Sequence, residues 1–342
     1  MEQIRIGVIG CGSIAKHRHL PEYHLNGRAE IMAVCDIVEE RAMDMAALYH
    51  AEAYTSYEDL LENPEIDAVS VCTPNYLHAP ISIAALKAGK HVLCEKPMAV
   101  SVEEAESMIE AARKYGKKLM IGHNQRFVPS HQKARAFIAS GEAGKVYSFR
   151  TAFGHGGPEG WSADGKDSWF FRKSEAFIGA MGDLGVHKAD LIRYLLGEEI
   201  TQAGAFVEAS SKENSDVDDT AVCILKTESG VIGTLAASWS YVSKEDNSTI
   251  IYAENAILRL EDDPVNSLVI QYKNGETLKY ELGGIQTNEE GKQTQSHVIS
   301  TFIDSIAEDK EPPVSGEEGL KSLRVVLAAL ESGHSGKIVR LP

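Results

Sequence analysis

Ile4-Arg-Ile-Gly-Val-Ile-Gly-Cys-Gly-Ser-Ile-Ala15 is the stretch that decides the fold of this chain. Its first half, residues 4–9, places β-branched residues on both faces, as a parallel strand buried on both sides requires. Its second half is a glycine-rich loop, and a helix with a break or bend at Pro21 is expected over residues 16–24. Glycines let such a loop turn tightly and approach a pyrophosphate at the start of the helix. The expected contacts are Gly10, Gly12, Ser13 and Ile14.

An acidic residue follows the second expected strand. Residues 31–35 form an apolar run, and Asp36 comes directly after it, close to the ~20 residues beyond the loop at which such folds place a ribose-binding acid. Its carboxylate would accept hydrogen bonds from both ribose hydroxyls and repel a 2′-phosphate, which favours NAD over NADP. The alternative, that Asp36 only caps the helix expected at 38–49, is weaker because strand, loop, helix and acid occur together.

Strands and helices then alternate over the first third of the chain. The expected elements are strands at 68–72, 91–94 and 118–121 and helices at 77–88 and 101–115. This rhythm is typical of a doubly wound parallel sheet. We therefore expect an α/β fold with a Rossmann-like first domain over residues 1–123.

The pattern changes in the second half, where short alternating strands are separated by turns. The expected strands are at 146–153, 219–226, 231–239, 249–253, 256–260, 267–272, 277–282 and 337–341, and helices are expected at 293–308 and 316–331. Such spacing is typical of antiparallel hairpins. We expect residues 124–342 to form an α+β domain with an open, mostly antiparallel sheet.

Two segments lie at the carboxyl ends of expected parallel strands, where ligands bind in such sheets. Residues 73–78 begin with Thr-Pro-Asn, which predicts either a cofactor contact or a turn in which Asn75 caps the next helix. Lys96 lies at the next strand end and is followed by a proline. Most lysines are solvated, but here the ammonium could stabilise negative charge on an alcohol oxygen. The candidate cofactor contacts are Thr73, Pro74, Asn75, His78, Glu95 and Lys96.

Three polar side chains interrupt an apolar segment at residues 179–190. At ~100° per residue, Asp183, His187 and Asp190 share one narrow stripe of a helix. Alone, the stripe could be a solvated face, but with Lys96 and the glycine loop in the same chain it favours catalysis. His187 would act as general base, and Asp183 would orient the imidazole and favour its charged form. A metal would need a ligand from another element, so none is expected.

A long irregular segment, residues 154–176, is rich in glycine and aromatic residues. A loop of this length is usually functional or disordered, and its tryptophans argue against disorder. Trp161 and Trp169 could cover the C–H face of a sugar ring while Asp164 or Arg172 binds hydroxyls. The alternative is simple packing onto the second domain.

The glycine loop, Asp36, Thr-Pro-Asn at 73–75, Glu-Lys-Pro at 95–97 and the segment 179–190 together resemble the Gfo/Idh/MocA family of sugar and cyclitol oxidoreductases. The resemblance covers nearly the whole chain, and Ala180 replaces one of the paired glycines of the family pattern. It implies that Lys96, Asp183 and His187 are catalytic and that Asp190 contacts substrate, although a helix-packing role for Asp190 stays open. It also implies that Arg126 lines the substrate pocket, although an interdomain structural role stays open. A second subunit would cover the open sheet and give a homodimer or homotetramer.

Composition limits the partners. The 342 residues are 43% hydrophobic and 25% charged, which describes a soluble globular protein long enough for two domains. A net charge of −16 without a basic run argues against nucleic acid and anionic membranes. No signal peptide or membrane-span pattern occurs, and five cysteines without metal-site spacing fit a reducing compartment, so we expect a cytoplasmic protein.

These observations predict an NAD-preferring dehydrogenase that moves a hydride between a secondary alcohol of a sugar or cyclitol and the nicotinamide. Two alternatives stay open. One is a hydrolase or lyase of the same family that retains NAD and uses it transiently. The other is a non-catalytic, dinucleotide-binding regulator.

Overall fold

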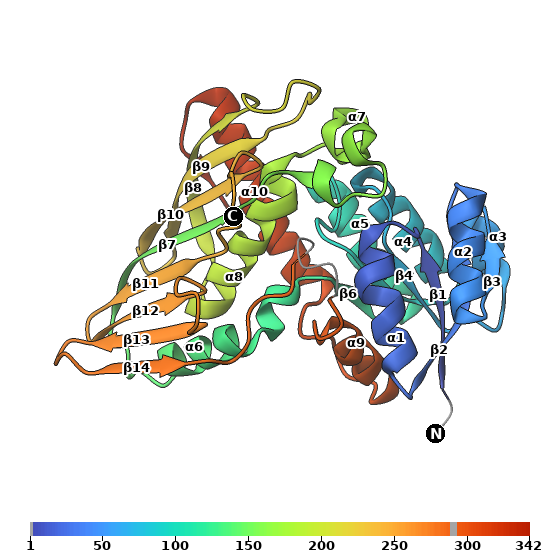
Figure 1. Cartoon of the computed structure of the whole chain (residues 1–342), viewed down its shortest axis with the longest axis horizontal. Coiled ribbons are helices and arrows are strands. Elements are labelled where there is room, and N and C mark those ends of the chain that lie inside the picture. The colour runs from blue at the N-terminus through green and yellow to red at the C-terminus, as the bar shows by residue number, and fades with distance from the viewer. Residues whose placement is uncertain (1–2, 288–292) are drawn as a thin grey trace.

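Two sheets lie side by side, and each carries its own helices (Figure 1). The computed structural model describes residues 3–287 and 293–342. The first sheet is parallel and has the strand order β3-β2-β1-β4-β5-β6. Its strands are β1 (Ile4–Ile9), β2 (Ala29–Cys35), β3 (Glu52–Tyr54), β4 (Ala68–Val71), β5 (His91–Cys94) and β6 (Leu119–Ile121).

β1 occupies the centre of this sheet because its side chains are apolar on both faces. It pairs with β2 on one side and β4 on the other, and Ile6, Val8 and Ile9 are almost completely buried. The strand order reverses between β1 and β4, so the chain leaves β1 at a topological switch point. The glycine loop after Ile9 therefore lies at the edge where ligands bind in such sheets.

Helices cover both faces of the first sheet. In chain order they are η1 (Ala15–His19, a π-helical turn), α1 (Leu20–Leu25), α2 (Glu39–Tyr49), α3 (Tyr57–Glu62), α4 (His78–Lys87) and α5 (Val102–Tyr115). One helix from far downstream joins them, because α9 (Val298–Ala307) packs Val298 and Phe302 into the same apolar core as Leu20 and Tyr23 of α1. The expected domain boundary between residues 123 and 124 stays a prediction, but α9, beyond it, contributes to the first domain.

The second sheet has nine strands in the order β14-β13-β12-β11-β7-β10-β9-β8-β15. β7 and β10 pair in parallel, and the other neighbours described pair antiparallel. The strands are β7 (Val146–Gly154), β8 (Ile200–Glu208), β9 (Thr220–Thr227), β10 (Ile232–Ser238), β11 (Thr249–Ala253), β12 (Ala256–Leu260), β13 (Leu268–Tyr272), β14 (Thr277–Tyr280) and β15 (Val339–Arg340). The expected fold class is therefore confirmed.

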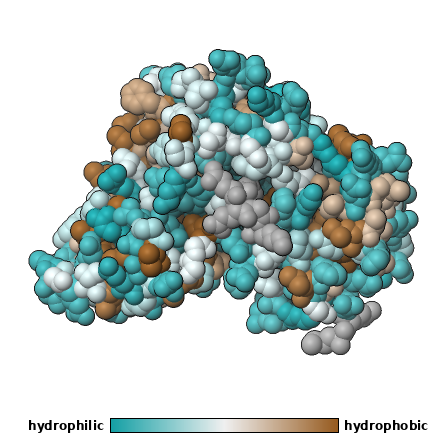
Figure 2. All heavy atoms as spheres, in the orientation of Figure 1, coloured by the Kyte–Doolittle hydropathy of each residue, from teal (hydrophilic) through white to brown (hydrophobic). Residues whose placement is uncertain are grey.

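One face of the large sheet is covered by helices and the other is open. α8 (Val186–Leu196), α10 (Gly316–Ser335) and α6 (Pro129–Ala139) pack against the first face. On the open face, Phe206 is 83% exposed and Ile224 is 64% exposed, and Val222 and Ile232 lie beside them. Figure 2 shows apolar residues gathered over this end of the sheet. Side chains point alternately to the two faces along each strand, so the residues between the exposed ones, as in β9, point into the core.

Candidate active site

A cavity of about 850 Å³ lies where the two domains meet. This volume is typical of a site for a cofactor together with a small molecule. The predicted cofactor contacts all line it: Gly10, Gly12, Ser13, Ile14, Asp36, Thr73, Pro74, Asn75, His78, Glu95 and Lys96. Asp183 and His187 face the same space from the second domain. The predicted cofactor contacts and the predicted catalytic residues, which lie far apart in the sequence, therefore line the same cavity.

The glycine loop has the shape that a bound pyrophosphate requires. Gly10 has a φ of +95°, and a Cβ there would lie 2.6 Å from the backbone oxygen of Cys72, so a side chain cannot be accommodated. A Cβ on Gly12 would meet nothing within 4 Å, which leaves the backbone open to the cavity. These two positions fit a dinucleotide whose phosphates approach the main chain closely.

Asp36 lies directly after β2, at the far end of the same groove. Its carboxylate oxygens accept hydrogen bonds from the backbone N–H groups of Cys11 (2.8 Å) and Val38 (2.9 Å). Each carboxylate oxygen can accept a further bond. The side chain is therefore held in place and can still bind ribose hydroxyls, so the residues fit the adenosine half of NAD.

Glu95 anchors the strand end that carries Lys96. Its Oε1 accepts hydrogen bonds from His19 Nε2 (2.9 Å) and Arg18 (3.4 Å), and Oε2 accepts one from the backbone N–H of Lys96 (3.3 Å). Burial alone would raise the pKa of Glu95, but the His19 hydrogen bond and the Arg18 charge outweigh it and lower the pKa to about 2. Glu95 is therefore an ionised anchor, and behind it His19 hydrogen-bonds Ser70.

His78 and Asn75 hold neighbouring segments together. The ring nitrogens of His78 lie 2.7 Å from the Pro97 oxygen and 2.8 Å from the Thr73 oxygen, so the imidazole ties the two strand-end turns to each other. Asn75 donates from Nδ2 to the backbone oxygen of Ala176, in the second domain (2.8 Å). The cap role considered for Asn75 is not seen, because its side chain makes no cap hydrogen bond to the following helical turn among the described residues.

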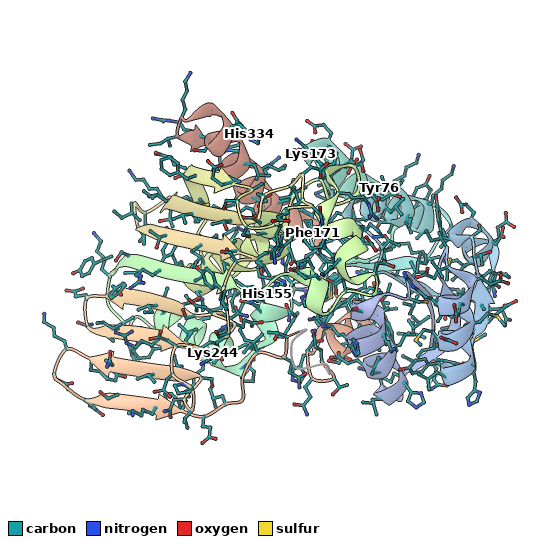
Figure 3. The ribbon with its side chains drawn as sticks, turned by 45° about the horizontal axis from the view of Figure 1, so that its top comes forward. Tyr76, His155, Phe171, Lys173, Lys244 and His334 are labelled. Atoms are coloured by element: carbon teal, nitrogen blue, oxygen red, sulfur yellow. The ribbon has the colours of Figure 1, made fainter. Side chains whose placement is uncertain are left out.

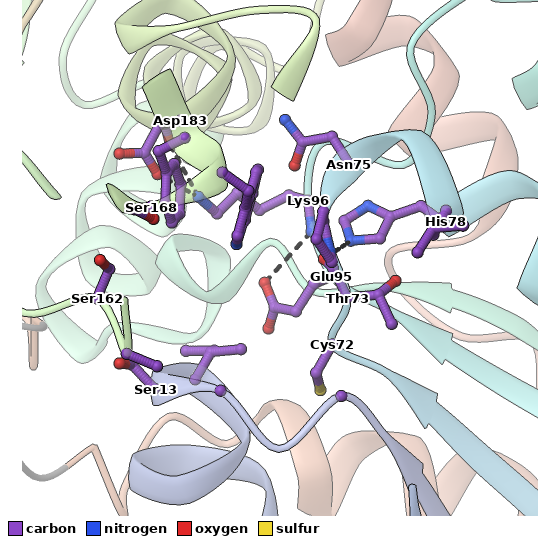
Figure 4. Close-up of a pocket in the computed structure, with 18 of the residues that line it drawn as sticks. Ser13, Cys72, Thr73, Asn75, His78, Glu95, Lys96, Ser162, Ser168 and Asp183 are labelled. Atoms are coloured by element: carbon purple, nitrogen blue, oxygen red, sulfur yellow. Dashed lines mark hydrogen bonds and ion pairs between the residues drawn. The ribbon is translucent and has the colours of Figure 1, made fainter. Parts of the chain in front are cut away.

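Lys96 reaches from the first domain to Asp183 of the second (Figure 4). Its ammonium donates to the carboxylate Oδ1 and to the backbone oxygen of Asp183, both at 2.9 Å. The other carboxylate oxygen accepts a hydrogen bond from the indole of the fully buried Trp239 (3.1 Å). Asp183 is thus fixed on two sides, and it holds the ammonium at the wall of the cavity.

His187 is buried at the same wall, with 8% of its surface exposed. Its ring packs against those of Phe153 (5.7 Å between centroids) and His123 (6.4 Å). Burial first, and then the positive charge of Lys96, hold the pKa of His187 well below its usual value. The neutral imidazole is therefore the resting form, as a proton acceptor requires.

The expectation that Asp183 orients His187 and favours its charged form is wrong. Both carboxylate oxygens of Asp183 are bonded to Lys96 and Trp239, and no described group bonds His187 Nδ1. The cause is local: η7 (Met181–Gly185) is a π-helical turn, which changes the stripe that a regular helix would present. Gly179 begins this region, and a side chain there would clash with the backbone oxygen of Asp218.

Asp190 and Arg126 lie outside the cavity lining, which does not support the substrate contacts expected for them. Asp190 is completely buried and accepts two hydrogen bonds from the Arg126 guanidinium (2.7 and 2.6 Å) and one from Ser322 of α10 (2.8 Å). Arg126 also bonds Glu318 (2.9 Å). The geometry therefore favours the structural alternatives: Asp190 packs α8 against α10, and Arg126 links residues 122–127, which join the two domains, to α8.

The segment 154–176 folds over the cavity mouth and touches the first domain at three points. Ser13 Oγ donates to the Trp161 backbone oxygen (2.6 Å), Arg41 of α2 forms an ion pair with Asp164, and Asn75 holds Ala176. Figure 1 shows its helix α7 (Lys173–Ala176) between the two sheets. The segment therefore reaches across to the first domain, which the sequence did not indicate.

Of the predicted substrate residues, four belong to this segment and line the cavity. They are Trp161, Asp164, Trp169 and Arg172. Trp169 stacks on Phe170 with ring centroids 3.9 Å apart, and Arg172 pairs with Glu175. Their contacts with a sugar stay predictions.

Several lining residues were not predicted from the sequence. They are Arg18, Arg41, Asn124, Gln125, Phe153 and Glu245. Asn124 and Gln125 stand directly before Arg126, so the crossing after β6 could have signalled them, whereas nothing local marks Glu245. Within residues 3–287 and 293–342, no cluster of three potential ligands is arranged to hold a metal, and no helix is long and apolar enough to cross a bilayer.

Two family models match the chain. Residues 4–123 match a model described as "Oxidoreductase family, NAD-binding Rossmann fold", and residues 131–259 match the "GFO/IDH/MocA C-terminal domain". Among curated proteins, the levoglucosan dehydrogenase of Pseudarthrobacter phenanthrenivorans is 30% identical over 70% of this chain and 68% of its own length. The myo-inositol 2-dehydrogenase of Thermotoga maritima is 29% identical over 99% and 98%.

Two solved structures have the same fold over nearly the whole length of this chain. A levoglucosan dehydrogenase in complex with NADH and L-sorbose has a TM-score of 0.88 at 25% identity and covers 100% of both chains. An aldose-aldose oxidoreductase from Caulobacter crescentus complexed with glycerol has a TM-score of 0.86 at 26% identity, over 99% of this chain and 100% of its own. With the Rossmann groove, the Lys96–Asp183 pair and His187 in one cavity, the chain belongs to the Gfo/Idh/MocA family of NAD-binding oxidoreductases.

Proposed function

We propose that this protein is an NAD-dependent dehydrogenase that oxidises a secondary alcohol of a sugar or cyclitol, or reduces the corresponding ketone. One observation carries the proposal: a neutral imidazole, His187, and an ammonium, Lys96, share the wall of the cavity that the glycine loop opens into. NAD, when bound, supplies the nicotinamide carbon that accepts or returns the hydride.

His187 and Lys96 divide the work at the reacting oxygen. His187 takes the hydroxyl proton as general base, since its imidazole is unprotonated at neutral pH. Lys96 donates a hydrogen bond to the same oxygen and stabilises the negative charge that develops there. Asp183 holds the ammonium in place through its carboxylate and its backbone oxygen.

NAD is the preferred cofactor in this proposal. Asp36 presents a carboxylate where the adenosine ribose would lie, and a 2′-phosphate would meet that charge. Ile37, beside it, is 89% exposed and offers no positive charge.

The substrate class follows from the second-domain wall. Asn124 Oδ1, Gln125 Oε1 and Trp161 Nε1 are buried and have no hydrogen-bond partner within the described parts of the chain. Buried polar atoms of this kind need partners, and a polyol brings several hydroxyls. Relatives named inositol and levoglucosan dehydrogenases support the same class.

The open sheet face is proposed as the contact between subunits. Its exposed apolar row, Phe206 with Ile224 and Ile232, is a surface that a second copy would cover. Five buried, unpaired thiols suit a reducing compartment, and we place the protein in the cytoplasm.

A His187→Ala variant tests the assignment. We expect turnover to fall by about 10²-fold or more when polyols, aldoses and keto-sugars are assayed through nicotinamide absorbance. His334→Ala is a matched control, because His334 is exposed at the far end of α10, away from the cavity (Figure 3). Near-normal turnover of His187→Ala at neutral pH would contradict the role of base.

The same assays separate the alternatives. Product formed without net change in nicotinamide absorbance would identify a hydrolase or lyase that retains NAD. Tight NAD binding without turnover on any substrate of the panel would identify a regulator.

A further inference from the structure

Arg41 is a positive charge on the wall of the cavity that Asp36 also lines. It lies in the first turns of α2, five positions after Asp36, and both side chains line the cavity. The charges of both residues act on one buried thiol: burial and then Asp36 raise the pKa of Cys11 to about 12, while Arg41 opposes them. An arginine in this neighbourhood is the group that accommodates a 2′-phosphate in dinucleotide-binding folds. The first domain thus carries both an acid that suits NAD and a cation that would suit NADP.

The second domain places a carboxylate on that cation. Asp164, in the segment 154–176, forms an ion pair with Arg41, and it lines the same cavity. The contact is supported nearby by the hydrogen bond from Ser13 to the Trp161 backbone oxygen and by the short helical turn η5 (Gly165–Asp167) that follows Asp164. Since the Arg41 and Asp164 side chains are 31% and 39% exposed, the pair adds little to stability. Its effect is on the local charge.

We propose that Asp164 is a cofactor-selectivity residue contributed by the second domain: it neutralises Arg41 and so keeps the adenosine end of the groove unfavourable to a 2′-phosphate. Both carboxylates then disfavour a 2′-phosphate, but they do so from different domains. Asp36 repels the phosphate directly, and Asp164 occupies Arg41, the cation that would otherwise bind it. The inference rests on the NAD preference proposed above.

Asp164→Asn removes the negative charge and keeps the size of the side chain. We expect the ratio of NADPH to NADH affinity to rise about fivefold, which corresponds to ~1 kcal/mol. Direct binding, measured by isothermal titration calorimetry without substrate at one fixed ionic strength, reads this ratio independently of turnover. The gain should shrink as salt is added, because the groups are near the surface.

Two further variants identify the source of the gain. Asp167→Asn makes the same charge change three residues away on the same segment and cavity wall, where the ion pair with Arg41 is untouched, so its ratio should change by less than twofold. Arg41→Ala combined with Asp164→Asn should return the ratio to the wild-type value or below it.

The outcomes are distinct. An unchanged ratio in Asp164→Asn, an equal gain in Asp167→Asn, or a gain that persists without Arg41 would each overturn the role of Asp164. Equal wild-type affinity for NADH and NADPH would instead contradict the cofactor choice proposed above, and the change of ratio between variants would still decide the role of Asp164.

Discussion

Asp190→Asn tests whether α8 is held by a buried ion pair or carries a substrate contact at this position. Asp190 accepts three hydrogen bonds, two from Arg126 and one from Ser322, and its side chain is 1% exposed. Asparagine keeps the shape but removes the charge and turns an NH2 group toward the guanidinium. We expect the variant to lose stability because Arg126 would remain buried with weaker compensation.

The size of the loss follows from the buried ion pair. Breaking such a pair by removing one partner costs ~3–5 kcal/mol, and because Glu318 still bonds Arg126 (2.9 Å), we expect a loss at the low end of this range, about 3 kcal/mol. The pKa of Asp190 shifts in the matching direction. Burial would raise it, yet the positive charges of His123 and Arg126 lower it from 3.8 to about 2, so the folded state favours the ionised carboxylate.

The pH dependence has a definite sign. Because the folded-state pKa is lowered, this stabilisation is present above about pH 4, the ordinary pKa of the carboxyl, and is lost as pH falls through about 2. The difference between wild type and Asp190→Asn should therefore be largest at neutral pH and shrink as the pH is lowered through this range. Urea titration followed by fluorescence of Trp161, Trp169 and Trp239 measures it in the second domain.

Asp262→Asn is the matched control, because Asp262 pairs with Arg259 at the surface (2.8 Å). Its loss should stay within ~0.5 kcal/mol. A loss of less than ~0.5 kcal/mol in Asp190→Asn, together with a rise of more than about tenfold in its KM for substrate, would contradict the structural role of Asp190. That result would restore the substrate contact expected from the sequence.

Three further substitutions test the active site and the open sheet face. Lys96→Met should lower turnover about 10²-fold and move the acidic limb of kcat/KM to higher pH, since Lys96 lowers the pKa of His187; a pH profile with an unmoved limb would contradict this. Trp239→Phe removes one hydrogen bond to Asp183, so kcat should fall about tenfold with little change in KM, and a change in KM alone would speak against it. Ile224→Asp should shift sedimentation toward the monomer, whereas Glu311→Lys, away from the large sheet, should not; a monomeric wild type would refute the interface.

The first domain could be predicted because its signals are local. The glycine loop follows β1 directly and Asp36 follows β2 directly, so neighbouring residues specify both the element and the site. β3 was missed because three residues at a sheet edge carry little pattern. β8 was missed because Ile200–Glu208 contains Ala and Gly at several positions, and its partly exposed residues do not alternate clearly.

Contacts between distant residues could not be predicted. Arg41 and Asp164 meet because the segment 154–176 crosses to the first domain, and Lys96 meets Asp183 because the domains close on each other. Nothing near either residue in the chain indicates its partner. Tertiary packing also decided the position of α9, whose apolar face is covered by the first domain rather than the second.

The difference between the expected and observed partner of Asp183 changes the chemistry of the site. A regular helix would place the carboxylate of Asp183 beside His187. The carboxylate would then raise the pKa of the imidazole and leave much of the base protonated. With the π-helical turn, Asp183 holds Lys96 instead, and burial, together with the Lys96 ammonium, keeps the imidazole of His187 neutral. Lys96 then has two effects in the proposed reaction: it stabilises negative charge on the alcohol oxygen and keeps His187 ready to accept the proton. The Asp183 side chain supports both effects through its ion pair with Lys96, so in this reaction Asp183 acts through Lys96 and not directly on His187.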